Sequence, residues 1–72
     1  MHPLDQYLKE KGSNRNRLAT RCGLSPSNLS SYIRRNTKVE NIPAKVIFAL
    51  AKETDETMDH VYMAMLEFQN GE

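Results

Sequence analysis

The residues of this sequence best suited to molecular recognition lie in one short stretch near its middle. Ser27, Asn28 and Ser31 both donate and accept hydrogen bonds, and two arginines follow at Arg34 and Arg35. Short polar side chains allow close approach to a polar surface, and arginine binds carboxylate and phosphate groups through several N–H donors. The stretch therefore suits contact with an anionic partner that offers its own donors and acceptors.

Residues for catalysis or metal binding are sparse. His2 and His60 are far apart in the sequence, and we expect both at the surface rather than at a metal. Cys22 is the only cysteine, which excludes an internal disulfide, and we expect it to be a small buried residue of a helix. The thiol has no evident histidine partner, and the sequence has no glycine-rich phosphate loop. We therefore expect no enzyme, cofactor, metal or small-molecule ligand.

Length and apolar content limit the class of protein. Seventy-two residues allow a single domain, which we take to span residues 1–72 with residues 69–72 frayed. No apolar run approaches the ~18 residues needed to cross a bilayer, and the N-terminus lacks the apolar core of a signal peptide. We therefore expect a soluble protein of the cytoplasm that has no membrane partner.

The charges are divided unevenly along the chain. Residues 1–38 contain eight lysines and arginines against two acidic residues, and residues 39–72 contain two against seven. Such asymmetry favours a first half that faces a polyanion. Solvated surface charge in both halves would give the same counts, so this alternative stays open.

Apolar spacing and capping residues predict five helices and no strand, which is an all-α fold. The helices are expected to run from Pro3 to Gly12, from Asn14 to Gly23, from Ser25 to Arg35, from Asn41–Pro43 to Thr54 and from Thr57 to Phe68, with a polar loop at 36–41. Their apolar stripes should pack around one small core. The stripes contain Leu4, Tyr7 and Leu8; Leu18, Ala19 and Cys22; Leu29, Tyr32 and Ile33; Val46, Ile47, Leu50, Ala51 and Thr54; and Met58, Val61, Tyr62, Met65 and Leu66.

Residues 14–35 have the parts of a helix-turn-helix. Gly23 permits the left-handed backbone angle of a tight turn, and Leu24 can fill the corner between the two helices. With Leu29 at the centre of the buried face, Ser27, Ser31 and Arg34 lie opposite it. A helix with such a face fits the major groove of DNA, where base edges offer donors and acceptors. The helix N-termini after Asn14 and Ser25 suit phosphate.

The segment "LATRCGLSPSNLSSYIRR" resembles the helix-turn-helix of the phage-repressor and Cro-type family, also called lambda repressor-like. Further on, "PAKVIFALAK" and "TMDHV" are similar to the fourth helix and the start of the fifth helix of that family. The likeness covers roughly residues 3–66. The family pattern is matched by Leu18, Ala19, Gly23, Leu24, Ser25, Leu29, Ser30 and Tyr32.

The resemblance implies a compact five-helix domain that binds double-stranded DNA, usually as a homodimer on a palindromic operator, and controls transcription. It places base contacts at Ser27, Asn28 and Ser31, and the length of Arg34 allows it to reach guanine as well. It places the start of the second helix against phosphate, and neighbouring cations extend that contact. The expected phosphate-contacting residues are Asn14, Arg15, Arg17, Ser25, Arg35 and Lys38.

The chain departs from the family pattern at several positions. Arg15 stands where glutamine is frequent, and Ile33 stands where glutamate is common. The loop after the third helix carries "RRNTK" where a glycine is usual. Residues 54–56, Thr-Asp-Glu, replace a common Leu-Gly-Val. The loop and the corner between the fourth and fifth helices are therefore the least constrained parts of the comparison.

Three apolar side chains exceed what the small core requires. Phe48, Met63 and Phe68 either pack within the molecule or form a contact with a second copy or another protein. Two other functions stay open. The bundle could be a protein-interaction module that does not bind DNA, or a nucleic-acid binder that is indifferent to sequence.

Overall fold

Five α-helices and one short 3-10 helix make up the fold in the computed structural model, which describes residues 1–71. No strand occurs in that range, so the all-α prediction is confirmed. None of these helices combines the length and the apolar character needed to cross a membrane. In chain order the elements are α1 (Pro3–Glu10), α2 (Arg15–Cys22), α3 (Pro26–Arg34), η1 (Val39–Asn41), α4 (Ala44–Thr54) and α5 (Met58–Asn70).

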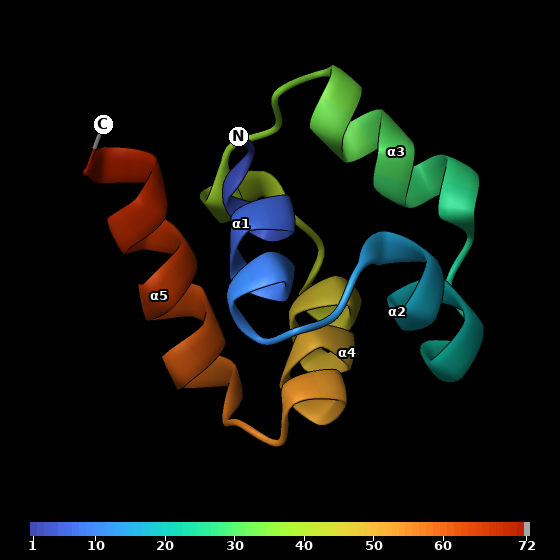
Figure 1. Cartoon of the computed structure of the whole chain (residues 1–72). Helices are drawn as coiled ribbons and strands as arrows, with labels where there is room; N and C mark the ends of the chain where they lie inside the picture. The colour runs from blue at the N-terminus through green and yellow to red at the C-terminus, as the bar shows by residue number, and fades with distance from the viewer. Residues whose placement is uncertain (72) are drawn as a thin grey trace.

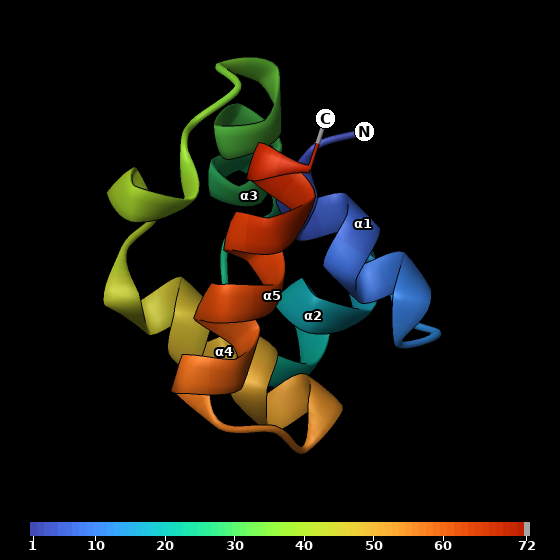
Figure 2. The same ribbon diagram turned by 90° about the vertical axis from the view of Figure 1, so that its left-hand side faces the viewer.

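The helices surround one core. Figure 1 shows α5 on one side, α1 and α4 in the middle, and α2 and α3 on the other side; Figure 2 gives the view at 90°. Helix α5 packs on α1 and α4, α2 packs on α4, and α3 packs chiefly on α2. Only Leu29 of α3 is buried, so this helix lies on the core rather than within it. The largest fully buried side chains are Tyr7, Leu4, Leu8, Leu18, Leu29, Leu50, Met65, Val39, Val46 and Val61.

Most predicted helix ends are confirmed because they depend on local backbone chemistry. The side-chain oxygen of Asn14 accepts from the N–H of Arg17 at 2.9 Å, and Ser25 caps α3 in the same way through Asn28 at 3.3 Å. The Thr57 hydroxyl caps α5 through the N–H of His60 at 3.1 Å. Each bond satisfies a helix N–H that has no partner within its own helix.

The expectation that His2 lies at the surface is wrong. This residue is the N-cap of α1 and only 8% of its surface is exposed. Its Nδ1 accepts from the N–H of Leu4 at 3.1 Å, and its Nε2 lies 2.8 Å from the carbonyl oxygen of Thr37. Since a carbonyl can only accept, Nε2 carries the proton. The ring thereby joins the start of α1 to the segment after α3.

The polar loop predicted at 36–41 contains η1 and a fully buried valine. Val39 is 0% exposed, and its N–H donates to Oε1 of Gln69 at 2.9 Å. The prediction failed here because one valine among polar neighbours shows no periodicity. The start of α4 also differs: Asn41 belongs to η1, while Pro43 is the N-cap and makes no side-chain capping bond.

The apolar stripes of α3 and α5 are narrower than predicted. Tyr32 and Ile33 are half-buried, and Met58 is exposed. Helix α5 continues past Phe68, where the sequence suggested fraying, and ends at Asn70. The side chain of Gln69 supports this extra turn through its bond to Val39. The expectation for Glu72 lies outside the described residues.

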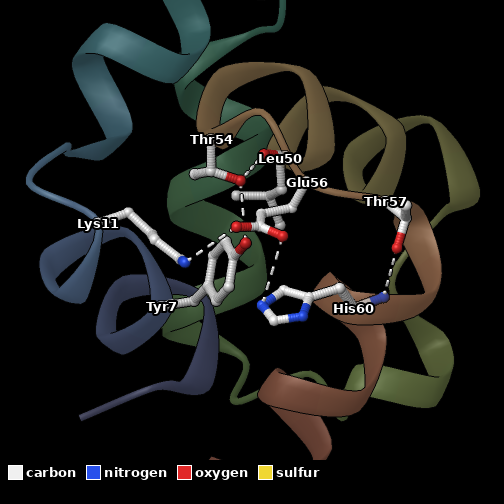
Figure 3. Close-up of polar contacts among 7 residues, drawn as sticks. All are labelled: Tyr7, Lys11, Leu50, Thr54, Glu56, Thr57 and His60. Atoms are coloured by element: carbon white, nitrogen blue, oxygen red, sulfur yellow. Dashed lines mark hydrogen bonds and ion pairs between the residues drawn. The ribbon is translucent and has the colours of Figure 1, made fainter.

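The corner between α4 and α5 is built from polar groups, as Figure 3 shows. The Thr54 hydroxyl donates to the carbonyl of Leu50 at 2.8 Å and lies 2.9 Å from the Tyr7 hydroxyl, which therefore donates to it. Asp55 adopts the left-handed conformation, with φ of 57°. Glu56 then lies between Lys11 Nζ at 3.4 Å and the imidazole of His60 at 3.7 Å.

Candidate nucleic-acid interface

The turn that joins α2 to α3 consists of Gly23, Leu24 and Ser25. Gly23 has φ of 67°, a conformation that costs a residue with a Cβ free energy, although a Cβ there would meet no atom within 4 Å. The N–H of Leu24 donates to the carbonyl of Ala19 at 3.0 Å, which closes the end of α2. The backbone requirement, rather than crowding, therefore explains the glycine.

The outward face of α3 has the composition that the sequence predicted. Ser27, Asn28, Arg34 and Arg35 are exposed, and Ser31 is half-buried. The helix lies at the edge of the molecule, far from α5 (Figure 1). A straight, narrow element with short polar side chains is therefore free on its outer side.

Arg15 is fixed by contacts within the protein. Its Nε lies 3.0 Å from Oδ1 of Asp5, and its Nη1 donates to the Ser30 hydroxyl at 3.2 Å. A guanidinium has five N–H donors, so these two contacts leave others for an anion. The side chain joins α1, α2 and α3, a structural role that the sequence analysis did not assign to it.

The other predicted phosphate contacts are exposed side chains at Asn14, Arg17, Ser25, Arg35 and Lys38. The capping oxygens of Asn14 and Ser25 already accept helix N–H groups, so the Asn14 amide N–H and the Ser25 O–H are what an anion can use. Arg17 donates to the carbonyl of Gly12 at 3.5 Å. Within residues 1–71, Arg34, Arg35 and Lys38 form no ion pair.

Sequence reasoning missed Lys45 as a candidate site residue. This exposed lysine in the first turn of α4 lines a hollow of about 230 Å³ together with Ser25 and Asn28. No local pattern points to Lys45, because it lies in the acidic half of the chain and far along it from α3. The packing of α4 on α2 adds a positive charge beside the predicted base-contacting face.

The three apolar residues predicted as contacts are not gathered on one surface. Phe48 of α4 and Met63 of α5 are 52% and 62% exposed, whereas Phe68 is half-buried and packs against the core. Phe48 lines a groove with Cys22 and Leu24, and Phe68 lines a different hollow with Met1 and Pro3. Phe48 and Phe68 therefore belong to different surfaces.

No group of three or more metal-ligating side chains is found among residues 1–71. Cys22 is half-buried, and its thiol donates to the carbonyl of Ala49 at 3.6 Å. Comparison with family models, with curated proteins and with solved structures finds no match to the chain.

Proposed function

We propose that this protein is a sequence-specific double-stranded DNA-binding regulator of transcription with the lambda repressor-like helix-turn-helix. In this proposal it is a repressor of a bacterial, phage or plasmid operon. The observation that carries the proposal is the outward face of α3, where exposed Ser27 and Asn28 precede the exposed Arg34 and Arg35. Leu29 is the only buried residue of this helix, and the exposed outer side of the helix is available to DNA.

In the proposed complex, α3 enters the major groove. Ser27, Asn28 and Ser31 form hydrogen bonds with base edges, and Arg34 reaches the O6 and N7 acceptors of guanine. The small side chains matter because they let the helix backbone lie deep in the groove.

Contacts to phosphate hold the domain in register on the duplex and carry no sequence information. The capping residues Asn14 and Ser25 present helix N-termini, where free N–H groups and the helix dipole favour an anion. Cations flank both ends of α3. The six cations assigned to this face are Arg15, Arg17, Arg34, Arg35, Lys38 and Lys45.

Two copies would bind a palindromic operator, with half-sites about one helical turn (~34 Å) or a multiple of it apart. Met63 of α5 is exposed and available to a second copy. The repressor would act in the cytoplasm by occupying DNA that polymerase needs.

Selection of bound sequences from a pool of randomised duplexes tests the proposal. The expected result is an enriched site with two-fold symmetry. With about six phosphates neutralised per protomer, each protomer should contribute about −5 to the log-log salt slope, which corresponds to roughly a thousandfold loss of affinity for one protomer between ~50 and ~200 mM salt.

Two other results would reject sequence-specific regulation. Binding to all duplexes with no enriched site would identify a sequence-indifferent nucleic-acid binder. Negligible affinity for every duplex at low salt would favour a protein-interaction module.

A further inference from the structure

An open groove lies between the C-terminal end of α2 and the exposed side of α4. Its volume is about 540 Å³. The apolar part is formed by Cys22, Leu24, Phe48 and Ala49, of which Phe48 is the most exposed. The exposed part of the phenylalanine ring is removed from water only when another molecule covers it. The groove therefore favours a ligand that places an apolar side chain on the ring.

Positive charge surrounds this apolar floor. Arg21, Lys45 and Lys52 line the groove together with a single carboxylate, Glu53. The side chain of Glu53 is only 4% exposed and is already engaged, by Arg21 Nε at 3.4 Å and by the Ser13 hydroxyl at 2.8 Å. The two lysines form no ion pair within residues 1–71, so their charges remain unbalanced.

These two residues are the only lysines or arginines in an acidic half of the chain. Residues 39–72 contain only two lysines and no arginine against seven acidic residues, and both lysines line this groove. Lys52 Nζ lies 5.4 Å from the centre of the Phe48 ring, a cation–π geometry that holds charge and aromatic ring together. The groove thus pairs an apolar anchor point with a cationic rim.

We propose that this groove binds an acidic amphipathic helix from a partner protein. An apolar side chain of that helix would lie on Phe48 between Leu24 and Ala49, and its carboxylates would pair with Lys45 and Lys52. Helices that bind grooves use apolar anchors at i, i+3 or i+4 and i+7, and complementary charge selects among partners. The acidic occupant is favoured over nucleic acid because the floor of the groove is apolar.

A second copy of the chain fits this groove less well. Two copies meeting groove to groove would bring like charges together. Docking of the acidic α5 of one copy into the groove of the next would be a head-to-tail contact, which closes only as a ring and otherwise grows into a filament. The partner inferred here is therefore a different protein.

Titration of the full chain with a synthetic peptide tests this inference. The probe is a fluorescein-labelled helical peptide of about 16 residues, long enough for marginal helicity, with leucine and phenylalanine at the anchor positions and glutamate elsewhere. Its amide-shift map on the ¹⁵N-labelled protein should centre on residues 21–24 and 45–53. A second peptide with glutamine in place of glutamate should bind at least several-fold more weakly.

Variants locate the contact. Phe48→Ala should weaken peptide binding about tenfold, as expected for truncation of a central anchor. The double variant Lys45→Gln, Lys52→Gln should weaken it several-fold and reduce its salt dependence. Met58→Ala, at an exposed methionine of α5, and Lys9→Gln, at an exposed lysine of α1, should have no effect. Thermal melts confirm that each variant folds.

The measurement is made without DNA, so its result is separate from that of the proposed function. The inference is overturned if no peptide binding is detected, if neither groove variant weakens it, or if the shifts lie elsewhere. It is also overturned if sedimentation reveals self-association that Phe48→Ala abolishes.

Discussion

Arg15 Nε lies 3.0 Å from Asp5 Oδ1, and this ion pair ties the first turn of α2 to α1. The same guanidinium donates to Ser30 of α3. One side chain therefore connects the proposed DNA-contacting helix to the body of the domain. Both partners of the ion pair are partly exposed, so we expect the pair itself to add little to stability. Its importance is where it places a positive charge.

The contribution of Arg15 to DNA binding can be separated from its role in positioning α3. Arg15→Ala should weaken binding to all duplexes alike and flatten the salt slope by about one, because one phosphate contact is lost. Asp5→Asn should strengthen binding to all duplexes, because it removes a carboxylate that competes for the guanidinium. Fluorescence anisotropy at several salt concentrations measures both effects. If both variants instead weaken only the selected site, with unchanged slopes, Arg15 positions α3 without binding phosphate.

Base reading by α3 predicts a loss confined to the matched site. Asn28→Ala or Ser31→Ala should reduce discrimination between the selected and a scrambled duplex by about 1–3 kcal/mol. Asn70→Ala, an exposed residue at the end of α5, is the matched control and should leave discrimination unchanged. Competition binding with the two duplexes gives the measurement. Unaltered discrimination in both α3 variants would reject their assignment as base contacts.

The two histidines should differ in their effect on stability. His2→Ala removes the cap of α1 and the bond to Thr37, which should lower the free energy of unfolding by about 1–2 kcal/mol. His60→Ala removes only an exposed pair with Glu56 at 3.7 Å and should change it by less than about 0.5 kcal/mol. Urea unfolding at neutral pH compares the two. Equal effects would show that the capping bonds of His2 contribute nothing.

Gln69 connects η1 to α5 and makes stability depend on pH. Its amide donates to Glu40 at 3.0 Å, and chiefly this bond lowers the pKa of Glu40 below its ordinary value of 4.5. Because this pKa is lower in the folded state than in the unfolded state, ionised Glu40 stabilises the fold at pH values above its unfolded-state pKa. This stabilisation is lost as the pH falls through the folded-state pKa.

Gln69→Leu should therefore have two consequences. The buried N–H of Val39 loses its partner, which should cost about 1–3 kcal/mol at neutral pH. The variant should also lose less stability than the wild type when acidification protonates Glu40. Urea unfolding of both proteins between about pH 3 and pH 6 measures this. Parallel pH profiles for wild type and variant would contradict the role given to Glu40.

The sequence predicts those features of the fold that depend on neighbouring residues. The caps at Asn14, Ser25 and Thr57 and the turn at Gly23 are set by backbone chemistry within four residues, and they are confirmed. The failures involve distant partners. The burial of His2 depends on a carbonyl 35 positions away, which no local pattern reveals.

The candidate site also combines features that local sequence predicts with features that depend on distant partners. The polar face of α3 follows from helical periodicity, so its exposed residues could be named in advance. The tether between Arg15 and Ser30 and the placement of Lys45 beside Asn28 arise from tertiary packing. A residue assigned by sequence to the acidic half of the chain thus becomes part of a cationic surface.

Lys45 and Leu24 line both the groove on α4 and the hollow beside the start of α3. A single ammonium group cannot neutralise a phosphate and a partner's carboxylate at once. If both proposed ligands bind, they must oppose each other, and thermodynamic reciprocity requires that each weakens the other by the same factor. Operator DNA and the acidic protein would then bind antagonistically, without any change in the conformation of the domain.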